Sequence, residues 1–255
     1  GEWSVGQAKL QQSLGLSRQC QDPTLTAQAL YLLNKMTSTY VDAIRGCEES
    51  LALWRQVGRP DRIVEVLNRV ASWNYCLGDY VKAITYWQEN IELCTALGMQ
   101  DALAWALNGL GWVAWCQGDL ATAQNYLQEG AESYRTIGMP SGVGYCLAAL
   151  ALVLRSGGAV EHAVAVAHQA VAIERDTEDR MMLVLSLTSL GAALIGVGDF
   201  AAARQAIQEA FQQLLVAQYP FFTVIAFYYF AELLMMESRA ANLSLALERK
   251  SLSVA

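Results

Sequence analysis

The amino-acid sequence predicts an all-α protein, an α-solenoid built from stacked antiparallel helix pairs. Three observations predict this fold. Small residues recur with a period of 40 residues, apolar residues recur at helical spacing on both sides of a glycine in each period, and 54% of the residues are apolar with only four prolines. A fixed period in the range of roughly 20–50 residues is typical of proteins whose units pack only on their neighbours.

The period holds without slippage over most of the chain. One position is glycine in four successive units, and a second position is alanine in five. The glycines are Gly78, Gly118, Gly158 and Gly198, and the alanines are Ala43, Ala83, Ala123, Ala163 and Ala203. Three of the four prolines share a third position, at Pro60, Pro140 and Pro220. We therefore place every structural element in this frame.

Each period predicts two helices joined by a tight turn. The glycine ends the first helix because glycine adopts the left-handed conformation that closes a helix C-terminus. The aspartate that follows, as in Gly78-Asp79, accepts from the free N–H groups of the second helix. The alanine a few residues later lets the two backbones approach closely, and the proline position stops the second helix before the next unit.

The frame divides the chain into five complete units, a leading helix and a partial unit. The leading helix, at 1–20, is predicted to be the remnant of an upstream unit. The complete units are 21–60, 61–100, 101–140, 141–180 and 181–220, and 221–255 is the partial unit. We predict one array over 1–255, excised from a longer protein. Ser238 and Leu243 replace the expected glycine and alanine, no polar cap is evident, and the uncapped apolar ends predict possible self-association.

The repeated motif resembles the tetratricopeptide repeat. Its residues are a leucine followed by an apolar and a small residue, as in Leu67, Val70 and Ala71, then the Gly78-Asp79 turn and Ala83. The 40-residue unit resembles the longer-helix variety in the sensor domains of bacterial MalT-like, LuxR-like and SARP-like transcription regulators. The resemblance implies a right-handed superhelix, a concave groove lined by the first helix of each unit, and a role in signal transduction.

The positions that would line this groove hold aromatic and polar residues. The predicted ligand-binding residues are Glu65, Asn68, Ser72, Tyr75, Trp105, Asn108, Trp112, Trp115, Tyr145 and Arg155. Aromatic rings stack on sugars or apolar side chains, and asparagine both donates to and accepts from a peptide backbone. The alternative is that the tryptophans fill a narrow solenoid interior. Trp112 in particular follows the small-residue position Gly111.

Several kinds of chemistry are missing from the sequence. It has none of the phosphate-binding, dinucleotide-binding, nucleophile-elbow or zinc-protease motifs, so we predict a protein that is not an enzyme and has no cofactor. The net charge is −7 and no basic stripe is present, which argues against direct nucleic-acid binding. His162 and His168 are predicted to be ordinary helix residues, and Cys76 and Cys116 to be repeat-register residues without a disulfide.

Two apolar stretches, at 181–197 and 220–236, contain polar residues and lack basic flanks, so no membrane span is predicted. The aromatic cluster in 220–230 is predicted to be a surface on which further units stack. We expect a cytoplasmic, ligand-sensing and protein-interaction domain that binds a small inducer or a peptide. The alternative is a scaffold for protein assembly without a small-molecule ligand.

Overall fold

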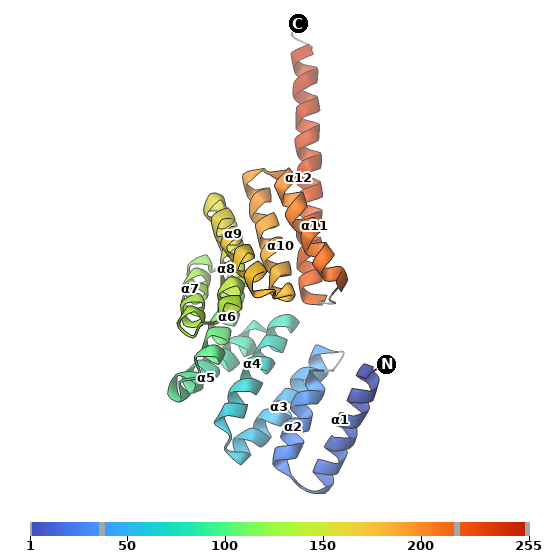
Figure 1. Ribbon diagram of the computed structural model, residues 1–255, viewed down its shortest axis with the longest axis vertical. Helices are drawn as coiled ribbons and strands as arrows, with labels where there is room; N and C mark the ends of the chain where they lie inside the picture. The colour runs from blue at the N-terminus through green and yellow to red at the C-terminus, as the bar shows by residue number, and fades with distance from the viewer. Residues whose placement is uncertain (1, 36–38, 217–219, 253–255) are drawn as a thin grey trace. The chain divides into compact units, whose positions relative to one another are not determined.

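The computed structural model describes residues 2–35, 39–216 and 220–252, with side-chain surroundings for 5–35, 39–215 and 223–242. Within these residues the chain forms twelve helices and no strand, which confirms the predicted all-α class (Figure 1). The helices are α1 (Glu2–Gln19), α2 (Pro23–Asn34), α3 (Tyr40–Val57), α4 (Pro60–Leu77), α5 (Tyr80–Leu97), α6 (Gln100–Cys116), α7 (Leu120–Thr136), α8 (Pro140–Ser156), α9 (Val160–Thr177), α10 (Arg180–Val197), α11 (Phe200–Val216) and α12 (Pro220–Leu252).

The helices group into two compact units, Gly1–Gln117 with α1–α6 and Gly118–Ala255 with α7–α12. Within the first unit each helix packs on the next one, and α4 also contacts α6. Within the second unit α10 contacts α8, α9, α11 and α12. The helix pairs follow the 40-residue frame, and the prediction that they form one array over 1–255 stays a prediction.

The predicted turn chemistry is present at the helix ends. Gly78 and Gly198 have φ angles of +86° and +84°, in the left-handed region that glycine adopts without strain. The Asp79 carboxylate accepts from the Lys82 backbone N–H at 3.1 Å, and the Asp199 carboxylate accepts from Ala202 at 3.0 Å. At the corresponding turn of α9, Ala159 provides no side-chain cap. These contacts explain why the frame fixes where each helix begins.

Small residues allow the close packing that the frame predicts. The alanines at the second frame position are fully or almost fully buried. At Gly191 in α10, a Cβ atom would lie only 2.6 Å from Cγ1 of Ile207 in α11. A larger residue there would push the two helices of the unit apart.

The last helix departs from the frame. Residue 238, where the earlier units have glycine, is Ser238, and α12 continues through it for a total of 33 residues. In Figure 1 the second half of α12 extends past the ends of α10 and α11. The side chains of residues 216–222 and of Leu243, which figured in the predictions for this end of the chain, lie outside the described residues.

One helix in the described part of the chain, Arg180–Val197 (α10), is long and apolar enough to cross a membrane, and 78% of it is buried inside the structure. Its apolar composition is explained by packing, because neighbouring helices cover it on several sides. Core helices of this kind are expected in the middle of a helical solenoid.

Candidate ligand-binding face

Eight of the ten predicted ligand-binding residues lie on α4 and α6 of the first unit. Two contacts join these helices along the predicted face. The Asn68 side-chain amide donates to the Ala102 carbonyl oxygen at 3.3 Å, and the Tyr75 hydroxyl lies 3.8 Å from the Cys116 sulfur. The α4–α6 face is defined here by Glu65, Asn68, Ser72, Tyr75, Trp105 and Trp115.

The four aromatic residues of the predicted set in this unit differ in exposure. Trp105 is 38% exposed, whereas Trp112 is only 4% exposed. Trp115 is half-buried, with its ring centroid 5.4 Å from that of Trp112. Tyr75 is also half-buried, and its ring lies 6.4 Å from that of Trp87. Trp112 therefore lies in the core, as the alternative interpretation of the tryptophans expected, while Trp105 faces solvent.

The polar members of the set are also divided between core and surface. Asn108 is 1% exposed and lies in the core with Trp112. Asn68 is half-buried, and the Ser72 hydroxyl donates to the Asn68 carbonyl oxygen at 2.8 Å. Because the hydroxyl donates in this hydrogen bond, the Ser72 oxygen can still accept a hydrogen bond from another group.

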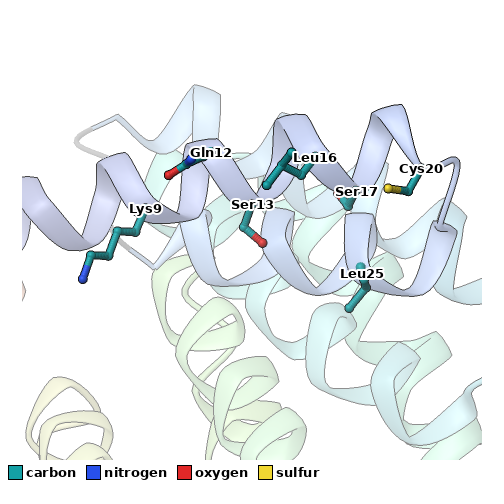
Figure 2. Close-up of a pocket in the computed structure, with 7 residues that line it drawn as sticks. All are labelled: Lys9, Gln12, Ser13, Leu16, Ser17, Cys20 and Leu25. Atoms are coloured by element: carbon teal, nitrogen blue, oxygen red, sulfur yellow. The ribbon is translucent and has the colours of Figure 1, made fainter.

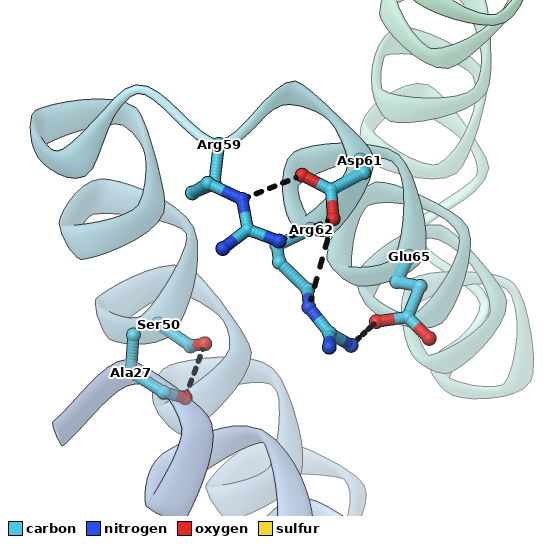
Figure 3. Close-up of polar contacts among 6 residues, drawn as sticks. All are labelled: Ala27, Ser50, Arg59, Asp61, Arg62 and Glu65. Carbon is cyan, nitrogen blue, oxygen red and sulfur yellow. Dashed lines mark hydrogen bonds and ion pairs between the residues drawn. The ribbon is translucent and has the colours of Figure 1, made fainter. Parts of the chain in front are cut away.

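Glu65 is exposed at the start of α4, within a line of alternating charges (Figure 3). Arg62 donates to Glu65 at 2.8 Å, and Arg59 donates to both carboxylate oxygens of Asp61, at 3.0 and 2.8 Å. The hydrogen bond from Arg59 lowers the pKa of Asp61. The figure also shows the Ser50 hydroxyl donating to the Ala27 carbonyl oxygen, which ties α3 to α2.

The two predicted residues of the second unit, Tyr145 and Arg155, lie on α8. Tyr145 is half-buried. Arg155 forms an ion pair with Glu232 of α12, in which both side chains are about one-fifth exposed, and its guanidinium lies 5.4 Å from the Tyr229 ring centroid. Burial raises the pKa of Tyr229 to about 12. Arg155 therefore fixes α12 to α8, which is a packing role that the sequence pattern did not reveal.

Six further positions of the second unit are equivalent, in the 40-residue frame, to predicted ligand-binding positions, and they are closed. They are at most 2% exposed, and they comprise Ala148, Leu152, Leu185, Thr188, Ala192 and Ile195. The predicted positions are thus partly exposed on α4, α6 and α8, where Asn108 and Trp112 are buried, and their equivalents on α10 are all buried.

A buried carboxyl group in the second unit was not predicted as a functional residue. Glu174 of α9 is 0% exposed, and its Oε2 lies 3.1 Å from the Ser141 hydroxyl, which lies 2.9 Å from Asp179 Oδ2. Burial raises the pKa of Glu174 to about 7. Because one hydroxyl proton cannot serve two carboxylates, a protonated Glu174 that donates to Ser141 satisfies both contacts. The repeat frame carries a signal for this group, because position 174 is equivalent to the buried Cys94 and Tyr134.

A surface hollow of about 440 Å³ lies on α1 and the first turn of α2 (Figure 2). None of its lining residues belongs to the predicted set. They are Lys9, Gln12, Ser13, Leu16, Ser17, Cys20 and Leu25. Four polar side chains line it together with Cys20 and the exposed apolar residues Leu16 and Leu25.

The ionisable groups that attract metal ions or nucleophilic chemistry are dispersed. His162 and His168 are both exposed on α9. Among the described residues no three His, Cys, Asp or Glu side chains gather in a way that could hold a metal ion. Burial raises the pKa of Cys47 to about 12 and that of Cys94 to about 11, which makes these two thiols poor nucleophiles.

The family comparison agrees with this architecture. The tetratricopeptide repeat family model matches residues 62–136, which include α4, α5 and α6. Residues 62–136 therefore match the tetratricopeptide repeat, over less than half of the chain. No curated protein matches the sequence.

Solved structures share this tetratricopeptide repeat fold over nearly the whole chain. BtubC from P. vanneervenii is 18% identical, with a TM-score of 0.68 over 86% of this chain and 94% of that one. The apo form of RapI is 13% identical, with a TM-score of 0.70 over 99% of this chain and 100% of that one.

A third structure is a signal transduction ATPase with numerous domains that carries a tetratricopeptide repeat sensor, from Pyrococcus horikoshii. It is 16% identical, with a TM-score of 0.67, and the match covers 86% of this chain but 35% of that protein. Tetratricopeptide repeat folds generally serve as scaffolds for protein interaction or sensing, because stacked helix pairs present long surfaces.

Proposed function

We propose that the α4–α6 face binds an extended peptide segment of a protein partner. The observation that carries the proposal is the contrast in exposure between this face and the equivalent positions of α10. The α4–α6 face leaves Trp105 38% exposed beside half-buried Trp115, Tyr75 and Asn68, whereas the equivalent positions 185, 188, 192 and 195 of α10 are at most 2% exposed. An exposed tryptophan beside half-buried aromatic and polar side chains is typical of a binding surface.

The chemistry of the face suits a peptide. The rings of Trp105 and Trp115 offer flat apolar surface to apolar side chains, at a low entropic cost because each ring has two rotatable bonds. Asn68 and Ser72 lie one turn apart on α4 and supply polar groups for a peptide backbone. The exposed Glu65 at the start of α4 favours a basic residue in the segment that lies there.

We further propose that this binding serves a sensor domain in a bacterial regulator of signal transduction or transcription, in the cytoplasm. Support comes from the P. horikoshii ATPase, whose repeats are named as its sensor, and from a Rap protein solved in complex with Competence and Sporulation Factor, which shares the fold at 14% identity and a TM-score of 0.65. A ligand that shifts the conformational equilibrium of such a regulator must bind one state more tightly than the other. For ordinary allosteric coupling the difference in binding free energy is about 1–3 kcal/mol.

The test is selection of binding peptides from a displayed random library, followed by titration of the best peptide against the chain. Trp105→Ala is expected to weaken binding by about tenfold or more, since exposed tryptophans at interfaces carry much of the binding energy. Tyr40→Ala is the matched control, because it removes an exposed aromatic ring of α3 that lies outside the α4–α6 face. Failure to select any peptide, or equal binding by both variants, would refute the proposal.

The same variants distinguish a small inducer from a peptide. A thermal shift panel of sugars, nucleotides and peptides should show a rise in melting temperature with peptides that Trp105→Ala removes. If a sugar or nucleotide raises the melting temperature, and Trp105→Ala removes this rise, the ligand of the face is a small inducer and not a peptide.

A further inference from the structure

The outer side of α12 carries an apolar face that is largely exposed in the described part of the chain, with Phe227 at its edge in ring contact with Phe211 of α11. Five large apolar side chains on it are 44–69% exposed, namely Val224, Phe227, Tyr228, Leu234 and Met235. Ala231 lies between them and is also exposed. These residues follow one another at steps of three and four, so they share one side of the helix. The opposite side, with Tyr229 and Leu233, is buried in the unit.

The 40-residue frame shows what covers this side in the earlier units. The residues equivalent to Val224 and Phe227 in α4, α6 and α10 are 0–3% exposed, and they are Val64, Leu67, Ala104, Leu107, Val184 and Leu187. The residue equivalent to Ala231 in α10 is Gly191, which packs tightly on Ile207 of α11. The covering element is therefore the second helix of the same unit, which runs antiparallel to the first.

In the last unit this second helix does not fold back within the described residues. The earlier turns rely on a glycine with positive φ, as at Gly198, and an aspartate that caps the next helix. Ser238 and Arg239 occupy these two positions, and α12 continues through them to Leu252. The α12 face thus keeps the residues that receive an antiparallel helix, while the turn that would deliver this helix is missing.

We infer that the α12 face binds the same face of a second copy of this chain, with the two α12 helices antiparallel about a twofold axis at Ala231. In this arrangement the two small Ala231 residues meet at the crossing point, where the helices can approach closely. Phe227 then lies opposite Met235 of the second copy, and Tyr228 lies opposite Leu234. The face is self-complementary because its small residue is central and its large residues flank it on both sides.

The charges of α12 also fit this pairing. Glu232 and Glu237 turn to the inner side and form ion pairs with Arg155 of α8 and Arg204 of α11, so the exposed face carries no carboxylate among residues 223–242. Each of the five large side chains exposes roughly 100 Å², about half of its surface. Two copies would then bury roughly 1,000 Å² in all, at the lower limit for a specific interface. We therefore expect a weak dimer, which forms as the protein concentration rises and dissociates as it falls.

The test is sedimentation velocity of the chain over a concentration series. The wild-type chain is expected to shift from monomer to dimer as the concentration rises. Met235→Glu and Tyr228→Glu should each weaken dimerisation by at least about tenfold, because each would bury an unpaired carboxylate in the seam. Val81→Glu is the matched control, since Val81 is an exposed apolar residue of α5 in the first unit. All four proteins should give the same helical circular dichroism.

Two further variants test the geometry. Ser238→Gly with Arg239→Asp restores the missing turn, and it should yield a monomer because the chain's own second helix then covers the face. Ala231→Cys, in a background with Cys20→Ser and Cys116→Ser, should give a crosslinked dimer with a short bismaleimide. Ala201→Cys on α11 should not.

Three results would overturn the inference. The first is a wild-type chain that stays monomeric at all concentrations. The second is a dimer that survives both Met235→Glu and Tyr228→Glu, which would place self-association on another surface. The third is a chain that stays monomeric alone but captures a helical peptide through the α12 face, because the occupant would then be a different partner.

Discussion

The buried carboxyl group of Glu174 is expected to make the free energy of unfolding depend on pH. In the folded chain its pKa is about 7, against an ordinary value of 4.5, because burial penalises the charged form. One pKa unit corresponds to about 1.4 kcal/mol, so this shift is equivalent to about 3 kcal/mol.

The sign follows from the direction of the shift. A carboxyl group whose pKa is raised by folding stabilises the protein when it is protonated. This contribution is fully present below pH 4.5, decreases as the pH rises toward 7, and is lost above pH 7. The folded state therefore becomes less stable between pH 5 and pH 8, unlike the usual case of a paired surface carboxylate.

The perturbation that isolates this effect is Glu174→Gln. The amide keeps the shape and the hydrogen bonds of a protonated carboxyl group toward Ser141 and Thr177 but cannot ionise. Urea unfolding at pH 5 and pH 8 gives the difference in unfolding free energy between the two proteins. At pH 8 the variant is expected to be more stable by about 2–3 kcal/mol, and at pH 5 the two should be nearly equal.

Glu161→Gln is the matched control, because Glu161 is an exposed carboxylate of the same helix. The difference in unfolding free energy between Glu161→Gln and the wild type should change by no more than about 0.5 kcal/mol between pH 5 and pH 8. If the difference between Glu174→Gln and the wild type were the same at pH 5 and pH 8, the argument from burial would be wrong.

Three further predictions concern packing, capping and the ion pair on α12, each measured as a change in the free energy of unfolding. Gly191→Ala should destabilise the chain by about 1–3 kcal/mol because its Cβ would overlap Ile207, whereas Gly15→Ala, with no atom within 4 Å, should stabilise it by about 0.5–1 kcal/mol. Ala159→Asp should stabilise the chain by about 0.5–2 kcal/mol, because it supplies the cap that the equivalent aspartates provide; no gain would show that the cap is not needed there. Arg155→Met should lower stability by about 2 kcal/mol by leaving Glu232 unpaired in a partly buried site, and adding Glu232→Met should restore most of the loss; a double variant as unstable as the single one would contradict this.

The repeat frame predicted the helices and their ends because both depend on local chemistry. Glycine at positive φ ends a helix, and an aspartate one residue later caps the next one, wherever these residues stand in the chain. The same rule explains α12. Ser238 breaks the frame, and the helix continues past the position where the earlier first helices end.

The candidate site was predicted only in part. The frame grouped Trp105, Trp115, Tyr75 and Asn68 on one side of α4 and α6, and all four side chains are at least partly exposed, while their role in binding stays a prediction. It could not separate Trp105 from Trp112, because two residues on similar sides of a helix differ in exposure only through their tertiary neighbours.

The sequence by itself determined that this chain is a helical repeat protein, where its helices begin and end, and which residues lie at equivalent positions. Those properties follow from spacing and from the conformational preferences of single residues. The tertiary structure alone decided that the predicted positions are closed in α10, that Arg155 holds α12, that Glu174 is fully buried, and that the α12 face is largely exposed. Burial and pairing depend on which segments meet in space. A periodic sequence predicts the same neighbours for every unit, but in the folded chain the neighbours differ from one unit to the next.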